Sequence, residues 1–410
     1  MQATTLGALS LDTLSGDEQR ISGGEPAVPS SGTPIVSEAQ VGSLYPFVQK
    51  TAEHSTLELS FLRDRFRNIE TWKREARLKV RELLRYKPPS CAQKAEVVES
   101  VDCGNYLREK IYFNTTPDIR VPAYLVLPKG EKKRRPAIVA LHDHGGFYVW
   151  GKEKVVALDK EHRSLTEFKR QYYAGRSYAD ELARRGYVVI VIDMFYWGER
   201  WMRLADDPPA WREPPKMSSD DVTAFNRRSS TSTALLATAL FEAGVTWSGV
   251  MFHDDIRTVD YLITRPEVDP DRIGCCGLSV GGFRSAWLAG LDARIKAAVV
   301  IGWMSTAGEM LKSKLTSIGL WKTVPGLYHY MDLPDVVSMT APGALMVIHG
   351  TKDKLFTNEG VNAAFDKIAK VFKKAGAPDR FEGVTYDGPH EFNAEMQAKA
   401  FACLDRWLKP

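Results

Sequence analysis

Hydrophobic residues between positions 57 and 86 recur at steps of three and four, with charged residues between them. This spacing places the apolar side chains on one face of a helix and predicts an amphipathic helix over 57–86. The positions that carry the pattern are Leu62, Phe66, Ile69, Trp72, Ala76, Val80 and Leu83. Pro88 and Pro89 end it. Residues 1–40 are instead rich in Ser, Gly, Thr and Pro without any period, which predicts a flexible arm.

Beyond residue 98, short apolar runs rich in β-branched residues alternate with helical patterns. Such alternation is typical of an α/β protein with a mostly parallel sheet covered by helices on both faces. We expect eight strands, of which the first two pair antiparallel, at 108–113, 121–127, 137–141, 187–192, 272–276, 297–301, 345–348 and 380–386. Helices are expected between most of them, as at 177–185, 253–264, 282–288 and 360–374.

The composition narrows the class of protein. The net charge of +4 over 410 residues is too balanced to suggest a nucleic-acid partner. No stretch approaches the roughly 18 apolar residues of a membrane span, and the N-terminus lacks the pattern of a secretory signal. The five cysteines are odd in number and have no CxxC spacing, so we expect reduced thiols, no zinc site and a cytoplasmic protein.

The strongest chemical signal is Gly277-Leu-Ser279-Val-Gly281, which follows a predicted strand and precedes a predicted helix. This is the context of a nucleophile elbow, in which a serine occupies a strained turn above the sheet. Glycines are needed two residues before and after the serine because side chains there would collide with the neighbouring strand and helix. Ser279 is therefore the expected nucleophile.

Its general base should follow it in the chain, beyond the last strand. Three of the eight histidines come after Ser279. His349 ends a buried strand and His329 lies in an aromatic insertion, whereas His390 lies in a turn-rich loop directly after the final strand. We expect His390 to be the base.

The acid of such a triad belongs on the loop after the preceding strand, where Asp353 stands. It would hold the imidazole in the correct tautomer and stabilise the imidazolium. A solvated turn aspartate paired with a neighbouring lysine is the plainer alternative for Asp353, and Asp387 is its nearest rival.

Two backbone N–H groups should stabilise the oxyanion, one from the residue after the nucleophile and one from the loop after strand 137–141. Val280 supplies the first. In the loop His142-Asp-His144-Gly145-Gly146-Phe147, either Gly146 or Phe147 supplies the second. The histidines of this loop have no third ligand at zinc-like spacing, so we expect them to orient the loop rather than bind metal.

Aromatic loops follow several strands and either form walls of a substrate pocket or pack on one another as a cap. The candidate pocket residues are His144, Gly145, Tyr148, Trp197 and Trp303. On the helix at 253–264, Asp254, Asp255 and Arg257 are expected to form structural ion pairs.

From about Trp72 to the C-terminus the chain resembles the dienelactone-hydrolase-like and acetyl-xylan-esterase-like bacterial esterases of the α/β-hydrolase fold. The resemblance lies in Gly277-Leu-Ser-Val-Gly-Gly282, in Arg265-Pro-Glu-Val-Asp-Pro-Asp-Arg-Ile273, in His144-Gly-Gly146 and in Trp197-Gly-Glu-Arg200. It implies the same triad of Ser279, Asp353 and His390. True dienelactone hydrolases use Cys where this chain has Ser279, and this departure favours ordinary carboxylic esters.

We therefore expect an α/β-hydrolase domain at 101–410, preceded by a helical extension at 41–100 and the arm at 1–40. The expected activity is serine esterase hydrolysis of short-acyl esters of soluble alcohols, including acetylated carbohydrates, with no cofactor and a small-molecule ester as the partner. A peptidase or amidase of prolyl-oligopeptidase type and a non-catalytic binding protein are the alternatives. Assembly into a homo-oligomer stays open.

Overall fold

The computed structural model describes residues 39–130 and 133–409. The arm predicted at 1–40 therefore lies outside the described residues except for its last two positions. The described residues form one compact unit. The boundary predicted at residue 100 falls inside a strand, Glu96–Asp102, and the division into an extension and a main domain stays a prediction.

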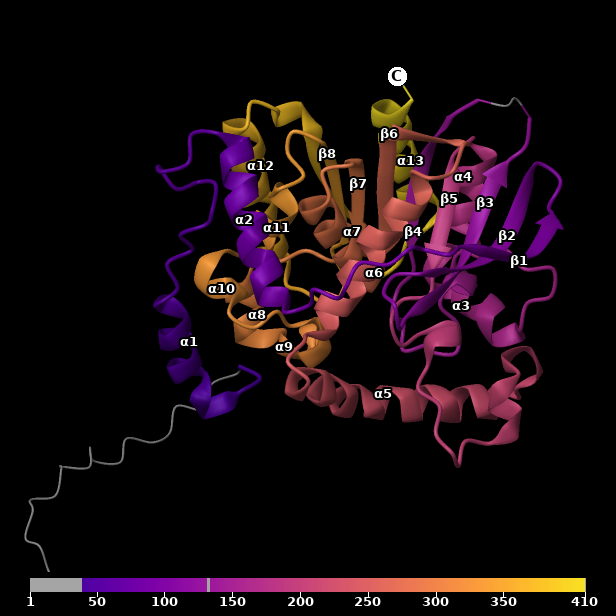
Figure 1. Cartoon of the computed structure of the whole chain (residues 1–410). Coiled ribbons are helices and arrows are strands. Elements are labelled where there is room, and N and C mark those ends of the chain that lie inside the picture. The colour runs from indigo at the N-terminus through magenta and orange to yellow at the C-terminus, as the bar shows by residue number, and fades with distance from the viewer. Residues whose placement is uncertain (1–38, 131–132, 410) are drawn as a thin grey trace, which may run out of the picture. The chain divides into compact units, whose positions relative to one another are not determined.

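A single nine-stranded sheet forms the centre of this unit, in the order β1-β2-β3-β5-β4-β6-β7-β8-β9 (Figure 1). Pairing from β1 through β3 to β5 is antiparallel, and every pair from β5 to β9 is parallel. The strands are β1 Glu96–Asp102, β2 Tyr106–Asn114, β3 Arg120–Pro128, β4 Arg135–Leu141, β5 Val188–Ile192, β6 Val268–Leu278, β7 Ile295–Ile301, β8 Ala344–Gly350 and β9 Phe381–Tyr386. The predicted mostly parallel sheet with an antiparallel pair at its start is confirmed.

The predicted number of strands was wrong, because β1 was missed. This strand has a single neighbour, β2, and its side chains are almost all exposed. An edge strand that buries neither face has no reason to alternate apolar and polar residues, so its sequence lacks the usual signal.

Helices cover both faces of the sheet (Figure 1). Their bounds are α1 Tyr45–Glu53, α2 Ile69–Leu84, α3 Arg163–Tyr173, α4 Tyr178–Arg184, α5 Ser219–Glu242, α6 Trp247–Leu262, α7 Val280–Leu291, α8 Ala307–Ser313, α9 Leu315–Ile318, α10 Leu327–Tyr330, α11 Leu333–Ser338, α12 Asn358–Lys374 and α13 Ala394–Leu408. Within the described residues no single helix is long and apolar enough to cross a membrane, and only α5 and α6 together, bent by 86°, meet that criterion of length and composition.

The amphipathic helix predicted over 57–86 is shorter than expected. It starts only after Asn68, whose side chain accepts a hydrogen bond from the Thr71 N–H and caps the helix. The segment before the cap folds into turns, and the Trp72 indole N–H anchors it by donating to the Leu59 carbonyl at 2.7 Å. The apolar face was predicted correctly, since Trp72, Ala76 and Val80 are buried.

The parallel strands bring the candidate residues to one edge of the sheet. Every residue of β5 and β8 is buried, as expected for strands with helices on both faces. The carboxyl ends of β4, β6, β8 and β9 point the same way, and the loops that follow them lie at that edge.

Candidate active site

Ser279 stands at a sharp turn between β6 and α7 with φ +59° and ψ −122°. Positive φ is costly for a residue with a side chain, so the turn is held by its surroundings. The Ser279 N–H donates to the Ile301 carbonyl of β7 at 2.8 Å, and the next residue begins α7. The strand, strained serine and helix occur in the order that the sequence predicted.

The two glycines beside this turn have no room for a side chain. A Cβ on Gly281 would lie 2.0 Å from the Leu141 carbonyl oxygen, and one on Gly277 would lie 2.5 Å from the same oxygen. Both distances are far inside van der Waals contact. The Gly-x-Ser-x-Gly pattern is therefore required because the start of α7 passes directly against the end of β4.

His390 and Asp353 form a close pair. Nδ1 of His390 lies 2.5 Å from Oδ2 of Asp353, whose other oxygen accepts the Leu355 N–H at 2.9 Å. The Asp353 side chain is only 1% exposed. Because the carboxylate accepts, the imidazole proton is on Nδ1, which leaves Nε2 as a proton acceptor.

The rival residues do not take part in this pair. Asp387 is exposed and pairs with Lys352 at 3.0 Å. His349 is buried in β8, where burial lowers its pKa, as expected for a core histidine. His329 lies on α10 with its ring at right angles to Tyr330. The structure thus brings Asp353, and not Asp387, to His390.

Ser279 and His390 open into one cavity of about 440 Å³. Among the residues predicted from the sequence, His144, Gly145, Gly146, Tyr148, Val280 and Trp303 also line it. Three predicted site residues do not: Asp353, which is bonded to His390, and the aromatic residues Trp197 and Phe147. Trp197 is fully buried and stacks on Tyr148 with ring centres 4.6 Å apart, so it supports the wall from behind. The Phe147 ring stacks instead on Phe168 at 4.8 Å.

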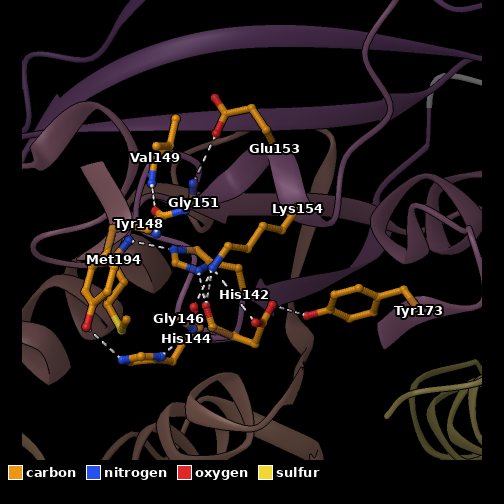
Figure 2. A network of polar contacts seen from close by, with 12 residues as sticks. His142, His144, Gly146, Tyr148, Val149, Gly151, Glu153, Lys154, Tyr173 and Met194 are labelled. Carbon is orange, nitrogen blue, oxygen red and sulfur yellow. Dashed lines mark hydrogen bonds and ion pairs between the residues drawn. The ribbon is translucent and has the colours of Figure 1, made fainter. Parts of the chain in front are cut away.

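The backbone N–H groups expected to complete the oxyanion hole are engaged within their own loop. Gly146 N–H donates to Nδ1 of His144 at 2.7 Å (Figure 2). Phe147 N–H donates to the His144 carbonyl at 3.1 Å. In the described structure, no protein acceptor takes the N–H of His144 or of Gly145. The second donor therefore stays a prediction within this loop, with the N–H groups of His144 and Gly145 beside the predicted Gly146 and Phe147. Val280 opens α7, where first-turn N–H groups have no partner in the helix.

A buried lysine holds the loop after β4 in place. Nζ of Lys154 donates to the carbonyls of Asp143 and His144, each at 2.9 Å, and lies 3.8 Å from the Asp143 carboxylate (Figure 2). The same carboxylate accepts the Tyr173 hydroxyl at 2.5 Å. Burial lowers the pKa of Lys154 to about 8. The Lys154 ammonium therefore fixes the backbone of Asp143 and His144, and with it the turn that contains the N–H groups of His144 and Gly145.

The histidines of this loop orient it, as predicted. Nε2 of His142 accepts the Met194 N–H at 3.0 Å, and its Nδ1–H donates to the Asp143 carbonyl at 2.9 Å. His144 is likewise bonded at both nitrogens, since Nε2 lies 3.0 Å from the Tyr148 hydroxyl. Burial lowers the pKa of both imidazoles well below the usual value, so both are neutral. Neither has a nitrogen left for a metal ion.

Part of the cavity wall comes from residues that the sequence did not indicate. Ser230 and Thr233 of α5 line it, as does Lys322, which follows α9. The long Ser- and Thr-rich helix α5 has a weak apolar period. The aromatic residues of the insertion after β7 are apparent in the sequence, but nothing in that pattern distinguishes Lys322.

Ion pairs with two aspartates of α6 hold α7, the helix that follows Ser279, and the loop after β5 that contains Arg200. Arg284 of α7 forms a fully buried bidentate pair with Asp255, and Arg200 pairs with Asp254 at 2.7 Å. Arg257 pairs with Asp260 one turn further along. The structural role predicted for these charges fits their contacts.

Comparison with known proteins agrees with this geometry. A family model described as the Abhydrolase family matches residues 36–406. The provisionally named hydrolase YtaP of Bacillus subtilis is 28% identical over 290 residues, which are 70% of this chain and 84% of the relative. The uncharacterised peptidase YuxL of the same organism is 29% identical over 178 residues, which are 40% of this chain and 26% of that protein. A solved Bacteroides fragilis structure, provisionally named an acetyl xylan esterase, has a TM-score of 0.64 at 19% identity and covers 86% of this chain and 85% of its own. This last likeness shows the fold.

Proposed function

The chain belongs to the Abhydrolase family, and we propose that it is a serine hydrolase of carboxylic esters that works through an acyl-enzyme. One observation carries the proposal. A serine held at φ +59° on a strand-to-helix turn opens into the same cavity as a histidine whose other nitrogen is bonded to a buried carboxylate. A histidine in this state accepts a proton at Nε2, which is what a serine needs to become a nucleophile.

The reaction has two steps. Ser279 attacks the acyl carbon while Nε2 of His390 takes its proton, and Asp353 stabilises the imidazolium. The oxyanion meets the N–H of Val280 and a second N–H from the loop after β4. The imidazolium then protonates the departing alcohol, and water activated by the same imidazole cleaves the acyl-enzyme. These steps require no metal or cofactor.

We propose short acyl groups on soluble alcohols as the substrate class, with acetylated carbohydrates included. The aromatic side chains of Tyr148, Trp303 and Trp321 in the cavity wall support a small, flat ligand, because aromatic faces stack on sugar and aryl rings. The name of the Bacteroides fragilis structure, an acetyl xylan esterase, points in the same direction.

Labelling with a fluorophosphonate tests the proposal directly. The wild-type protein should react at Ser279 and hydrolyse 4-nitrophenyl acetate, and Ser279→Ala should do neither. A wild-type protein that neither labels nor turns over any ester would make it a binding protein on this scaffold.

A peptidase or amidase is the second candidate, favoured by the similarity to the peptidase YuxL over part of its length. The catalytic groups would be the same, so the substrate decides between the two activities. Turnover of an acetanilide at a rate comparable with the matching phenyl ester would move the protein to the amidase class.

A further inference from the structure

Lys322 is a buried cation in the wall of the active-site cavity. Its side chain is 8% exposed, and both Lys322 and Ser279 line the cavity. Nζ lies 4.0 Å from the centre of the Trp321 ring and 5.7 Å from that of Trp303. Both tryptophans also line the cavity, so the ammonium stands between two indole faces at the surface that a substrate meets.

No carboxylate compensates this charge among the residues that the structure describes. Lys322 forms no hydrogen bond or ion pair there through its ammonium. The acid in the cavity wall is Asp143, and its carboxylate is already bound to Tyr173 and faces Lys154. A buried charge without a partner is costly, whereas cation–π contacts offset only part of that cost.

Two other buried lysines, Lys152 and Lys154, have the polar partners that Lys322 lacks. Lys152 contacts the carboxylates of Asp193 and Glu199, and Lys154 has its two backbone carbonyls. Burial lowers the pKa of Lys322 to about 7, and no neighbouring acid raises it again. A bound anion would be the missing partner and would favour the charged amine.

We propose that Lys322 forms an anion subsite that recognises a carboxylate on the substrate, so that the preferred esters carry a negative charge beside the scissile bond. The inference rests on the proposed esterase function and names its substrate class more closely. The hydroxyl-bearing residues Ser230, Thr233, Thr316 and Ser317 line the same cavity, which suits a polar, charged ligand. The neutral state of His144 suits this arrangement, because a second cation would compete with Lys322.

Two matched pairs of esters test the subsite in active enzyme. The acyl pair is 4-nitrophenyl hemisuccinate against 4-nitrophenyl pentanoate, and the alcohol pair is 4-acetoxybenzoate against 4-acetoxybenzamide. In one of these pairs the wild type should prefer the anionic ester by roughly tenfold or more in kcat/KM, the usual effect of a hydrogen bond to a charged group. Lys322→Met should lose that preference and Lys322→Arg should retain most of it.

The control is Lys312→Met, which removes an exposed lysine of α8 and should keep the wild-type preference. A wild type that favours the neutral ester in both pairs would overturn the subsite. A preference that survives in Lys322→Met would overturn it equally.

A binding measurement separates this proposal from the esterase proposal. Succinate and 4-hydroxybenzoate are titrated calorimetrically into Ser279→Ala and into Ser279→Ala with Lys322→Met. Binding of either anion that the second substitution weakens tenfold supports the subsite even if no ester is turned over. Equal affinity in the two variants, or no binding to either, counts against it, whatever the catalytic result.

Discussion

Nδ1 of His390 lies 2.5 Å from Oδ2 of Asp353, a carboxylate that is almost wholly buried. The pair joins two loops that follow different strands, β8 and β9. Gly302, after β7, lies so close that a Cβ there would stand 2.8 Å from Cε1 of the His390 ring. The imidazole is thus fixed on one side by its acid and on another by backbone.

This pair gives the first prediction. Ser279→Ala and His390→Ala should each lower kcat for 4-nitrophenyl acetate by roughly 10⁴-fold or more, because nucleophile and base act as one unit. Asp353→Asn should cost somewhat less. Stopped-flow or initial-rate kinetics measure the effect, with circular dichroism to verify the fold. Near-normal activity of Ser279→Ala would refute the mechanism.

Much of this site could be predicted from the sequence because its constraints are local. Glycines at 277 and 281 reflect backbone contacts that leave no space for a Cβ, and such contacts leave a mark on the sequence itself. The order of nucleophile, acid and base follows from the order of buried strands, which short apolar runs reveal.

The parts that could not be predicted depend on tertiary contacts. The N–H groups of Gly146 and Phe147 turn back onto His144, a contact that no spacing rule indicates. Strand β1 has no apolar face, and Lys322 enters the cavity only because the segment after α9 folds over it.

The second prediction concerns Lys154 as a positioning residue. Lys154→Met removes the donor to the carbonyls of Asp143 and His144, so the oxyanion donors lose their fixed geometry. We expect kcat to fall by roughly 10- to 100-fold with KM changed by less than about threefold, since loss concentrated in the transition state lowers kcat. Fluorophosphonate labelling should slow in parallel.

Lys169→Met is the matched control. Lys169 is also buried and donates to a backbone carbonyl, that of Val156. Val156 does not line the cavity, whereas the two residues whose carbonyls Lys154 holds, Asp143 and His144, do. It should lower the melting temperature without lowering kcat. Equal loss of kcat in both variants would mean that Lys154 acts only through stability.

The third prediction concerns the buried pair that fixes α7. Arg284→Met leaves Asp255 as an uncompensated buried charge, so the free energy of unfolding should fall by about 3–5 kcal/mol. Adding Asp255→Leu should recover most of the loss. Urea unfolding measures both variants. The exposed pair Glu167–Arg170 serves as the control and should change stability little. If Asp255→Leu does not recover the lost free energy of unfolding, then Arg284 stabilises the protein through packing and not through its charge.

The fourth prediction is a pH dependence of stability at Lys322. Burial lowers its pKa from 10.5 in a free side chain to about 7 in the folded protein. A lowered folded pKa means that the stability present above pH 10.5 is lost as the pH falls towards 7, because the unfolded chain takes up the proton first.

Lys322→Met has no proton to bind, so its advantage in unfolding free energy over wild type should grow as the pH falls from 10.5 to 7. The slope should approach about 1.4 kcal/mol per pH unit and vanish below pH 7. Urea unfolding at a series of pH values measures the difference between the two proteins. Lys312→Met should show no such slope, and a pH-independent difference for Lys322→Met would mean that the amine is solvated.

The fifth prediction concerns the length of the acyl chain. The cavity of about 440 Å³ must hold the acyl group and the alcohol together, and Tyr148, Trp303 and Trp321 occupy its wall. The rings of Tyr148 and Trp321 pack against other buried rings and leave little room for extra methylenes, so each added carbon beyond a short chain should meet the wall. Across 4-nitrophenyl esters from acetyl to dodecanoyl, kcat/KM should be highest between acetyl and butyryl and fall by roughly tenfold or more by octanoyl.

Acetylated xylose and an acetanilide belong in the same series, because they separate a sugar esterase from an amidase. Trp303→Ala provides the internal check on the wall, since removal of its indole should move the maximum towards longer chains while leaving Ser279 reactive to fluorophosphonate. The Trp303 ring packs against Phe283 and Phe356, so the variant must be shown to fold. A wild-type maximum at octanoyl or longer would contradict the short-acyl proposal, because a cavity walled by these rings could not favour a chain of that length.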